Sequence, residues 1–266
     1  MSSNSVEVVI YARSHPALRW LPVWQRNMLV WVKLAGPAIL GNFGEPLLYL
    51  LALGYGLGAF VENMSELPYL VFLASGTVCS SAMSTSSFEG MYSAYTRMAV
   101  QNTWGAMLAT PLGVSDVVLG ETAWAATKSL ISSTAILIVA ALLGAVAGPQ
   151  ALLVLPLVVL IGLCFGAMAL VVTALSRSYD FFLYYTTLFI TPSLLIGGVF
   201  FPLERMPVAI QWLASVLPLT HAVEIVRPLM TGLPLQNVGL HLAVVLGYTV
   251  VSLALAIHLI RRRLSA

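Results

Sequence analysis

Charged residues are scarce in this chain: of its 266 residues, only 8% are Asp, Glu, Lys or Arg. An ordinary soluble domain carries roughly 25% charged residues. Hydrophobic residues make up 59% of the sequence, which is more apolar surface than a soluble core of this size can hide. The net charge of +2 is dispersed over short polar segments, so we expect no nucleic-acid partner. The composition therefore predicts a membrane protein.

Cysteine and enzyme motifs are also sparse. Cys79 and Cys164 both lie inside apolar stretches, so we interpret them as small buried hydrophobes and not as a disulfide or a metal pair. The chain lacks a GxxxxGK[ST] loop for ATP, a GxSxG elbow and an HExxH motif. We therefore expect no cofactor, metal or catalytic residue on this chain, and a membrane enzyme is disfavoured. A short apolar core typical of a cleavable signal peptide is not evident in residues 1–36.

Long apolar stretches are abundant instead. A helix crosses the roughly 30 Å hydrocarbon layer with about 20 mostly apolar residues. Stretches of that kind run near 37–60, 67–88, 117–147, 151–175, 181–201 and 240–260. We therefore predict an all-α integral membrane protein with six transmembrane helices, in a transmembrane domain that covers residues 37–266.

The basic residues between these spans fall mostly on one side. If the N-terminus lies inside, nine Lys and Arg residues flank the spans on the inner side, and two, Arg205 and Arg227, lie outside. An excess of Lys and Arg marks cytoplasmic loops. We therefore predict that both termini are cytoplasmic.

The segment before the first span has two parts, a tail and an amphipathic stretch. Arg19, Arg26 and Lys33 are spaced by seven and share one helical stripe, while tryptophans cluster on the opposite side. This pattern predicts an interfacial helix lying on the cytoplasmic membrane surface. A cytoplasmic helix packed on a partner protein is the alternative.

The stretch 202–234 is semi-apolar but is interrupted by five prolines, which is too many for a plain span. We predict a pair of short helices that dip into the outer leaflet, a re-entrant segment. His221, Glu224 and Arg227 recur every three residues, so they share a helix face. Two candidate ligands do not complete a metal site, and we interpret this face as hydrogen-bonded and polar.

Charged side chains also occur at the inner ends of the second and third spans. Glu121 and Lys128 are seven apart and share a face. They could belong to a network, but we favour the interpretation that they snorkel towards the cytoplasm. Between these spans, 89–116 is unusually long for a connector, and a helix over 93–108 suits a partner-docking element.

Several separated motifs carry a resemblance to a known family. The chain resembles the ABC-2 family of exporter permeases in the phrases Met107–Leu112, Val118–Glu121, Phe201–Leu203, Pro218–His221 and Arg227–Pro228. Within that family it is similar to the permeases of rhizobial nodulation-factor exporters. The phrases that carry this closer likeness are Ile39–Asn42, Gly120–Lys128, Val171–Leu175 and Leu259–Leu264.

The resemblance implies the permease subunit of an ATP-driven exporter in the bacterial inner membrane. Its substrate would be a lipo-chitooligosaccharide, and ATP and Mg would bind on a separate P-loop ATPase. Two copies of this chain would assemble with two copies of that ATPase. The helix at 93–108 would couple the subunits, and the candidate contact residues are Tyr95, Arg97, Gln101 and Trp104. An ABC-2 exporter of another glycolipid, a polysaccharide or a drug is the alternative, followed by a gradient-driven carrier.

An amphiphilic substrate needs a path that is partly polar and partly aromatic. The candidate lining residues are Asn42, Glu45, Phe181, Phe182, Tyr184, Tyr185 and Phe189. An aromatic cluster at the inner end of a span is also typical of an interface belt, which is the competing interpretation.

Overall fold

The computed structural model describes residues 16–33, 36, 48, 50–60, 63–64 and 67–265. Its α-helices are α2 (Leu21–Val32), α4 (Tyr69–Phe88), α5 (Thr103–Leu108), α6 (Val114–Leu142), α7 (Val154–Leu175), α8 (Phe181–Tyr185), α9 (Thr191–Ile196), α10 (Val208–Val216), α11 (Pro218–Thr231) and α12 (Val238–Ser265). Short 3-10 turns are η1 (Pro16–Leu18), η2 (Leu57–Ala59), η5 (Pro149–Leu153) and η7 (Leu203–Arg205), and π-helical turns are η3 (Glu89–Ser93), η4 (Thr96–Val100) and η6 (Thr186–Ile190). The strands β1 (Asn63–Met64) and β2 (Leu67–Pro68) form a small antiparallel pair before α4.

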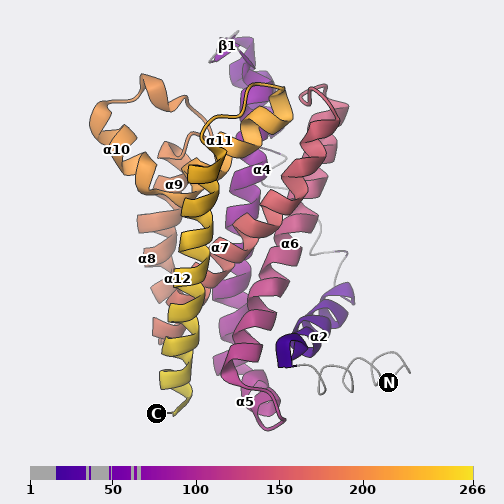
Figure 1. Cartoon of the computed structure of the whole chain (residues 1–266), viewed down its shortest axis with the longest axis vertical. Helices are drawn as coiled ribbons and strands as arrows, with labels where there is room; N and C mark the ends of the chain where they lie inside the picture. The colour runs from indigo at the N-terminus through magenta and orange to yellow at the C-terminus, as the bar shows by residue number, and fades with distance from the viewer. Residues whose placement is uncertain are drawn as a thin grey trace.

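The long helices run side by side along one axis of the molecule (Figure 1). One end carries α5, the C-terminus and the nearby helix α2, and we call it the α5 end. The opposite end carries α10, α11 and the strand β1, and we call it the α11 end. Helix α7 packs most extensively against α12 and α6, and then against α4. A Cβ at Gly162 of α7 would lie 2.7 Å from the Ala126 Cα, so the glycine allows α6 and α7 to approach closely.

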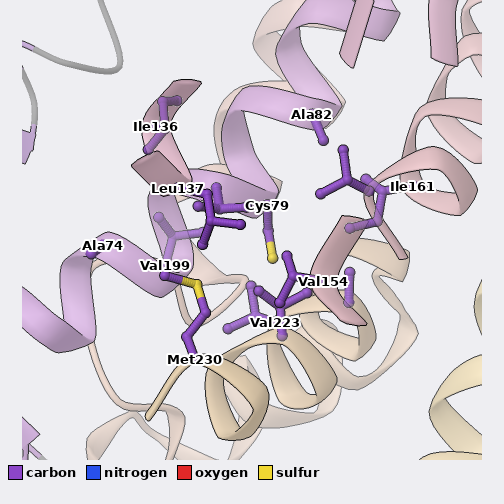
Figure 2. Close-up of a cluster of buried hydrophobic side chains, with 14 of the residues drawn as sticks. Ala74, Cys79, Ala82, Ile136, Leu137, Val154, Ile161, Val199, Val223 and Met230 are labelled. Atoms are coloured by element: carbon purple, nitrogen blue, oxygen red, sulfur yellow. The ribbon is translucent and has the colours of Figure 1, made fainter. Parts of the chain in front are cut away.

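A buried apolar cluster fills the bundle towards the α11 end (Figure 2). Side chains from α4, α6, α7 and α11 meet there, among them Cys79, Leu137, Val154 and Val223. Cys79 is fully buried among these side chains, as its predicted role of a small hydrophobe requires. The cluster fixes the positions of four helices, and therefore the polar groups that they carry at either end.

Serine hydroxyl groups join α4 to α6. The Ser81 Oγ and the Ser132 Oγ of α6 are hydrogen-bonded at 2.7 Å, and the Ser129 Oγ donates to the Ala82 carbonyl at 2.9 Å. Close, hydrogen-bonded contacts of this kind hold membrane helices together without a hydrophobic drive between them.

Among the described residues, three helical segments are long and apolar enough to cross a membrane, namely Val114–Leu142, Pro149–Leu175 and Val238–Leu264. They correspond to the predicted spans at 117–147, 151–175 and 240–260. The predicted span at 67–88 corresponds to the 20-residue helix α4, and the span at 181–201 to the shorter apolar stretch Phe181–Ile196. The all-α membrane class is confirmed. The count of six spans is confirmed only in part, because much of the first span lies outside the described residues.

The predicted pair of short helices is present at 202–234. Helices α10 and α11 meet at a bend of 91°. The bend falls between Leu217 and Pro218, where the backbone of Leu217 is extended with ψ of 129°. A proline disfavours the helical conformation in the residue before it, so the sequence itself separates the two helices.

Candidate functional site

Four charged side chains converge inside the α5 end of the bundle. Glu89 directly follows α4 and begins η3, and Arg97 lies in η4. Glu121 and Lys128 come from the same face of α6, which the Asp116 carboxylate caps by accepting a hydrogen bond from the Gly113 amide at 2.8 Å. We refer to Glu89, Arg97, Glu121 and Lys128 as the ion network.

Arg97 bridges the two carboxylates of the ion network. Its Nη2 donates to the Glu89 Oε1 at 2.7 Å and also to the Glu121 Oε2, while its Nε donates to the Glu121 Oε1 at 3.0 Å. Lys128 completes the set, because its Nζ donates to the Glu89 Oε2 at 2.8 Å. Two acids and two bases therefore neutralise one another across η3, η4 and α6.

Two tryptophans also donate hydrogen bonds to these carboxylates. The Trp104 Nε1 of α5 donates to the Glu121 Oε1 at 3.0 Å, and the Trp124 Nε1 of α6 donates to the Glu89 Oε1 at 3.0 Å. Both indole rings are buried. The ion network thus holds α5 as well as α4 and α6.

Burial makes this arrangement sensitive to the loss of any partner. The side chains of Glu89 and Glu121 are 3% and 1% exposed, and those of Arg97 and Lys128 are 12% and 14% exposed. Breaking a buried ion pair by removing one partner typically costs about 3–5 kcal/mol, since a charge is left uncompensated. We call the segment 89–113, which contains η3, η4 and α5, the α5 hairpin. The ion network ties this hairpin to the bundle.

The charges of Glu89 and Arg97 are stabilised by their partners. Burial raises the pKa of the Glu89 carboxyl, but the charges and hydrogen bonds of Arg97 and Lys128 outweigh burial and lower it to about 2. Burial lowers the pKa of the Arg97 guanidinium, but Glu121 and Glu89 outweigh burial and raise it above its ordinary value. Opposite charges at this distance favour both ionised forms.

This finding corrects one sequence interpretation. Glu121 and Lys128 do not snorkel separately towards the cytoplasm, since each is paired with a charge from another segment. Sequence reasoning also missed Glu89 and Trp124 as members of the site. A signal was available, because a carboxylate next to an apolar span requires a nearby counter-charge.

Helix α2 is packed on α6 beside the ion network. Val23 sits so close to Gly120 that a Cβ at position 120 would lie 2.5 Å from the Val23 Cβ. The Trp24 Nε1 donates to the Thr127 Oγ1 at 2.8 Å. The predicted amphipathic helix therefore exists, and part of its tryptophan face is used to contact protein.

Of the four residues predicted to contact an ATPase, Gln101 is exposed at the turn before α5. Tyr95 and Trp104 are 6% and 0% exposed, and Arg97 is occupied by the two carboxylates. A buried side chain cannot form a docking surface in this conformation. In this structure these three side chains hold the hairpin from within, and contact with an ATPase stays a prediction for all four residues.

An aromatic cluster secures the other side of this hairpin. The rings of Tyr95 and Tyr179 lie 4.9 Å apart, and Phe182 contacts Tyr95 edge-on at 5.4 Å. The Tyr95 hydroxyl donates to the Arg177 carbonyl at 2.7 Å. Offset and edge-on aromatic pairs contribute about 0.5–1.5 kcal/mol beyond their buried area. The cluster connects η4 with the segment that leads into α8.

The described residues that were predicted to line a substrate path differ in how exposed their side chains are. Phe181 and Tyr184 are exposed on α8, whereas Phe182 is fully buried in the aromatic cluster. Tyr185 and Phe189 are half-buried and stack on each other with ring centroids 5.2 Å apart. Asn42 and Glu45 lie outside the described residues. The structure thus does not bring all five aromatic side chains to one surface.

The side chains on the predicted polar face of α11 contact different neighbouring helices. The His221 Nε2 is 2.9 Å from the Ser215 carbonyl, and its Nδ1 is 2.8 Å from the His241 Nδ1 of α12. A carbonyl oxygen only accepts, so a neutral His221 carries its proton on Nε2 and accepts from His241 at Nδ1. This pair joins α11 to α12.

Arg227 turns towards α4 instead. Its Nη2 donates to the Gly198 carbonyl at 2.6 Å and its Nε to the Ser75 Oγ at 3.0 Å. The guanidinium carbon lies 3.7 Å from the centre of the Phe72 ring, a cation–π contact. Glu224 lines a cavity of about 290 Å³ beside Arg227. His221 and Arg227 therefore join α11 to neighbouring helices by hydrogen bonds, whereas Glu224 lines the cavity.

Comparison with known proteins gives consistent matches. The family model for the ABC-2 type transporter matches residues 20–231. The chain is 45% identical over 257 residues to Nodulation protein J of Rhizobium meliloti (strain 1021), an alignment that covers 96% of this chain and 98% of that protein. It is 47% identical over 247 residues to Nodulation protein J of Rhizobium leguminosarum bv. viciae, with 93% and 95% covered. The protein of the same name from Sinorhizobium fredii is 42% identical over 256 residues, with 96% and 98% covered.

Proposed function

The chain belongs to the ABC-2 type transporter family, the permease subunits of ABC exporters, and from this premise we propose that it exports a lipo-chitooligosaccharide. The observation that carries the proposal is its similarity, over nearly its whole length, to proteins that share the name Nodulation protein J. A likeness that extends through both ends of the bundle favours a common substrate as well as a common fold. The substrate class is an amphiphile with a sugar head and an acyl tail.

We further propose the assembly that such a permease needs. A separate, NodI-like P-loop ATPase binds ATP and Mg, and two copies of it pair with two copies of this chain. The α5 end faces the cytoplasm of the bacterium and both termini lie there, which agrees with the excess of Lys and Arg at that end. The protein then resides in the inner membrane.

The ion network suggests how ATPase motion reaches the membrane helices. A force on α5 is passed through Trp104 to Glu121 of α6, and through Arg97 to Glu89 at the end of α4. Rigid segments joined by buried contacts move together between discrete arrangements. Movement of the ATPase pair therefore tilts α4 and α6 together, which opens the substrate path alternately to the two sides.

The substrate path itself is proposed at the seam between two copies of this chain. Phe181 and Tyr184 present exposed rings on α8, where they are available to stack on sugar rings or to contact an acyl chain. Asn42 and Glu45 of the first predicted span would supply polar groups to the same path. Glu45→Gln tests the carboxylate: export at the normal rate, at normal expression, removes Glu45 from the path.

An export assay tests the substrate. Cells are pulse-labelled with radioactive glucosamine, with and without this chain, and labelled lipo-chitooligosaccharide is measured in medium and cells. When the chain is absent, we expect labelled lipo-chitooligosaccharide to be missing from the medium and to accumulate in the cells. Unchanged export would contradict this substrate and favour another glycolipid, a polysaccharide or a drug.

The energy source is tested in the same assay. A variant of the ATPase that binds but does not hydrolyse ATP should stop export as completely as loss of this chain. Export that continues with this variant and stops with an uncoupler would identify a gradient-driven carrier.

A further inference from the structure

The cavity of about 290 Å³ beside Arg227 lies at the α11 end of the bundle (Figure 1). Its walls come from the start of α4 and the strand before it, from η7, from α11 and from the loop that precedes α12. Glu204, Glu224, Arg227 and Gln236 contribute polar side chains, and the other lining residues are leucines, prolines and one phenylalanine. The cavity therefore places charges of both signs against apolar walls.

The charged side chains of this cavity do not pair with one another. Glu224 and Arg227 are three residues apart on α11, a spacing at which opposite charges commonly pair. The ion pairs found among the described residues all belong to the ion network at the other end, however. Within the described chain, the carboxylates of Glu204 and Glu224 thus have no cation at ion-pair distance.

Arg227 keeps donors available on the cavity side. A guanidinium group has five N–H donors. The contacts to the Ser75 Oγ and the Gly198 carbonyl use its Nε and Nη2, and the Phe72 ring covers one face of the group. The described residues provide no acceptor for the Arg227 Nη1. This nitrogen can therefore donate to a phosphate oxygen, the kind of group that arginine binds well.

The cavity lies at the level of the lipid headgroups. Leu67 is in the strand directly before α4, and Gln236 comes just before the apolar helical segment Val238–Leu264. Ends of membrane-spanning helices lie in the polar layer that borders the hydrocarbon. Leu233, which also lines the cavity, is exposed and is available to contact an acyl chain. Charged pockets between membrane helices at this depth recognise lipid headgroups.

The two signs of charge indicate the chemistry of the ligand. A phosphate satisfies Arg227, and a primary ammonium group satisfies the carboxylates of Glu204 and Glu224. Hydrogen bonds between charged partners are roughly twice as strong as those between neutral groups, which disfavours a sugar with hydroxyls alone. A quaternary ammonium has no N–H to donate, and a glycerol headgroup has no cation. The charges therefore favour a zwitterion that carries a phosphate and a primary ammonium.

We propose that this cavity binds the headgroup of a phosphatidylethanolamine molecule. Its phosphate pairs with Arg227, and its ammonium donates to Glu224 and Glu204. The bound headgroup joins α11 to η7 and to the start of α4, and so stabilises this end of the bundle. The inference goes beyond the proposed function and does not depend on which molecule the chain exports.

Lipid retention tests the proposal. The chain is released from nanodiscs that contain equal amounts of phosphatidylethanolamine, phosphatidylcholine, phosphatidylglycerol and diacylglycerol, and the retained lipids are identified by native mass spectrometry. We expect phosphatidylethanolamine to be retained at least about fivefold more than each of the others, because only this lipid carries both groups. Equal retention of the four lipids overturns the proposal.

Neutral variants of the carboxylates locate the retained lipid. Glu224→Gln should weaken retention of phosphatidylethanolamine roughly tenfold, which removes its advantage over phosphatidylcholine. Asp180→Asn, which removes an exposed carboxylate at the α5 end, is the control and should leave that advantage unchanged. If Glu224→Gln fails to fold, Glu204→Gln decides, because Glu204 is exposed and its substitution disturbs no packing. An advantage that persists in the folded variants overturns the site.

Thermal unfolding separates the lipid from soluble ligands with related chemistry. The chain is held in nanodiscs of phosphatidylcholine, to which phosphatidylethanolamine, soluble phosphoethanolamine or soluble chitotetraose is added. We expect the lipid alone to raise the unfolding temperature, by about 2 °C or more. Equal stabilisation by phosphoethanolamine would assign the cavity to a soluble phosphate compound and overturn the lipid. Stabilisation by chitotetraose together with loss of the retained lipid would assign it to a sugar and overturn the proposal as well.

Discussion

The two ends of the bundle hold their buried arginines in different ways. At the α5 end, Arg97 bridges two carboxylates, one of which also binds Lys128. At the α11 end, Arg227 is held by a hydroxyl, a backbone carbonyl and the face of Phe72, and no ion pair to it is found among the described residues. One end is therefore held by full charges and the other by neutral acceptors.

This difference bears on how the two ends can move. Separating buried opposite charges is costly, so the segments joined by the ion network are expected to move together. Hydrogen bonds from a cation to neutral groups are individually weaker and are more easily replaced by water. We therefore expect the segments at the α5 end to be held together more rigidly than those at the α11 end.

The largest effect is expected from breaking the bridge at the α5 end. Arg97→Met leaves Glu89 with Lys128 but leaves Glu121 without a cation, and we expect a loss of about 3–5 kcal/mol in the free energy of unfolding. Thermal unfolding of the chain in nanodiscs measures it, with the exposed Arg177→Met as control. Adding Glu121→Gln to Arg97→Met should recover part of the loss. Equal unfolding temperatures for Arg97→Met and the control would contradict the bridge.

A smaller effect is expected from the corresponding change at the α11 end. Arg227→Met removes hydrogen bonds to the Ser75 Oγ and the Gly198 carbonyl, and we expect a loss of about 1.5–3 kcal/mol. The exposed Arg205→Met at the same end is the control. If Arg227→Met destabilised the chain more than Arg97→Met, the contrast between the two ends would be wrong.

Removing one hydrogen-bond donor to the ion network should lower the free energy of unfolding by a still smaller amount. Trp104→Phe keeps an aromatic ring but loses the hydrogen bond to the Glu121 carboxylate, and we expect a loss of about 1.5 kcal/mol. Trp212→Phe is the matched control, because that indole is 72% exposed. Hydrogen exchange of the α5 amides, measured by mass spectrometry, should accelerate in Trp104→Phe and stay unchanged in the control.

The smallest effect is expected on the stability that Glu89 contributes when the pH is lowered from 8 to 5. Arg97 and Lys128 lower the pKa of Glu89 from 4.5 to about 2, so its contribution to stability is complete above pH 4.5 and is lost as the pH falls towards 2. The unfolding temperature of Glu89→Gln and of the unaltered chain should therefore differ by a constant amount from pH 8 to pH 5, and the difference should shrink below pH 4.5. A difference that changed between pH 7 and pH 5 would show that Glu89 is not held in this way.

The apolar spans could be predicted from the sequence because their signal is local. The stretch 151–175 is apolar throughout, and the structure has the helix Pro149–Leu175 there. The break at Pro218 was similarly visible, since proline acts on the residue directly before it. Predictions of this kind depend on neighbours in the chain and need no knowledge of packing.

The candidate site could be predicted only in part. The spacing of Glu121 and Lys128 put both on one face of a helix, but it did not reveal that Glu89 lies within 2.8 Å of the Lys128 Nζ. Tyr95, Arg97 and Trp104 were selected for their chemistry as surface residues, and all three point inwards. Whether an aromatic or charged side chain faces a partner or its own bundle depends on how distant segments pack.

The sequence by itself determined that this chain is a helical membrane protein, where its apolar helices lie and where the segment 202–234 bends, because hydrophobicity and proline act over a few neighbouring residues. Only the tertiary structure decided which charges neutralise one another and which remain available on the surface. Arg97 and Glu121 are 24 residues apart, and Lys128 is 39 residues from Glu89. These side chains meet because α4 and α6 pack side by side, whereas Arg177 stays exposed. Coulomb energy depends on separation in space, and that separation is set by the packing of the helices.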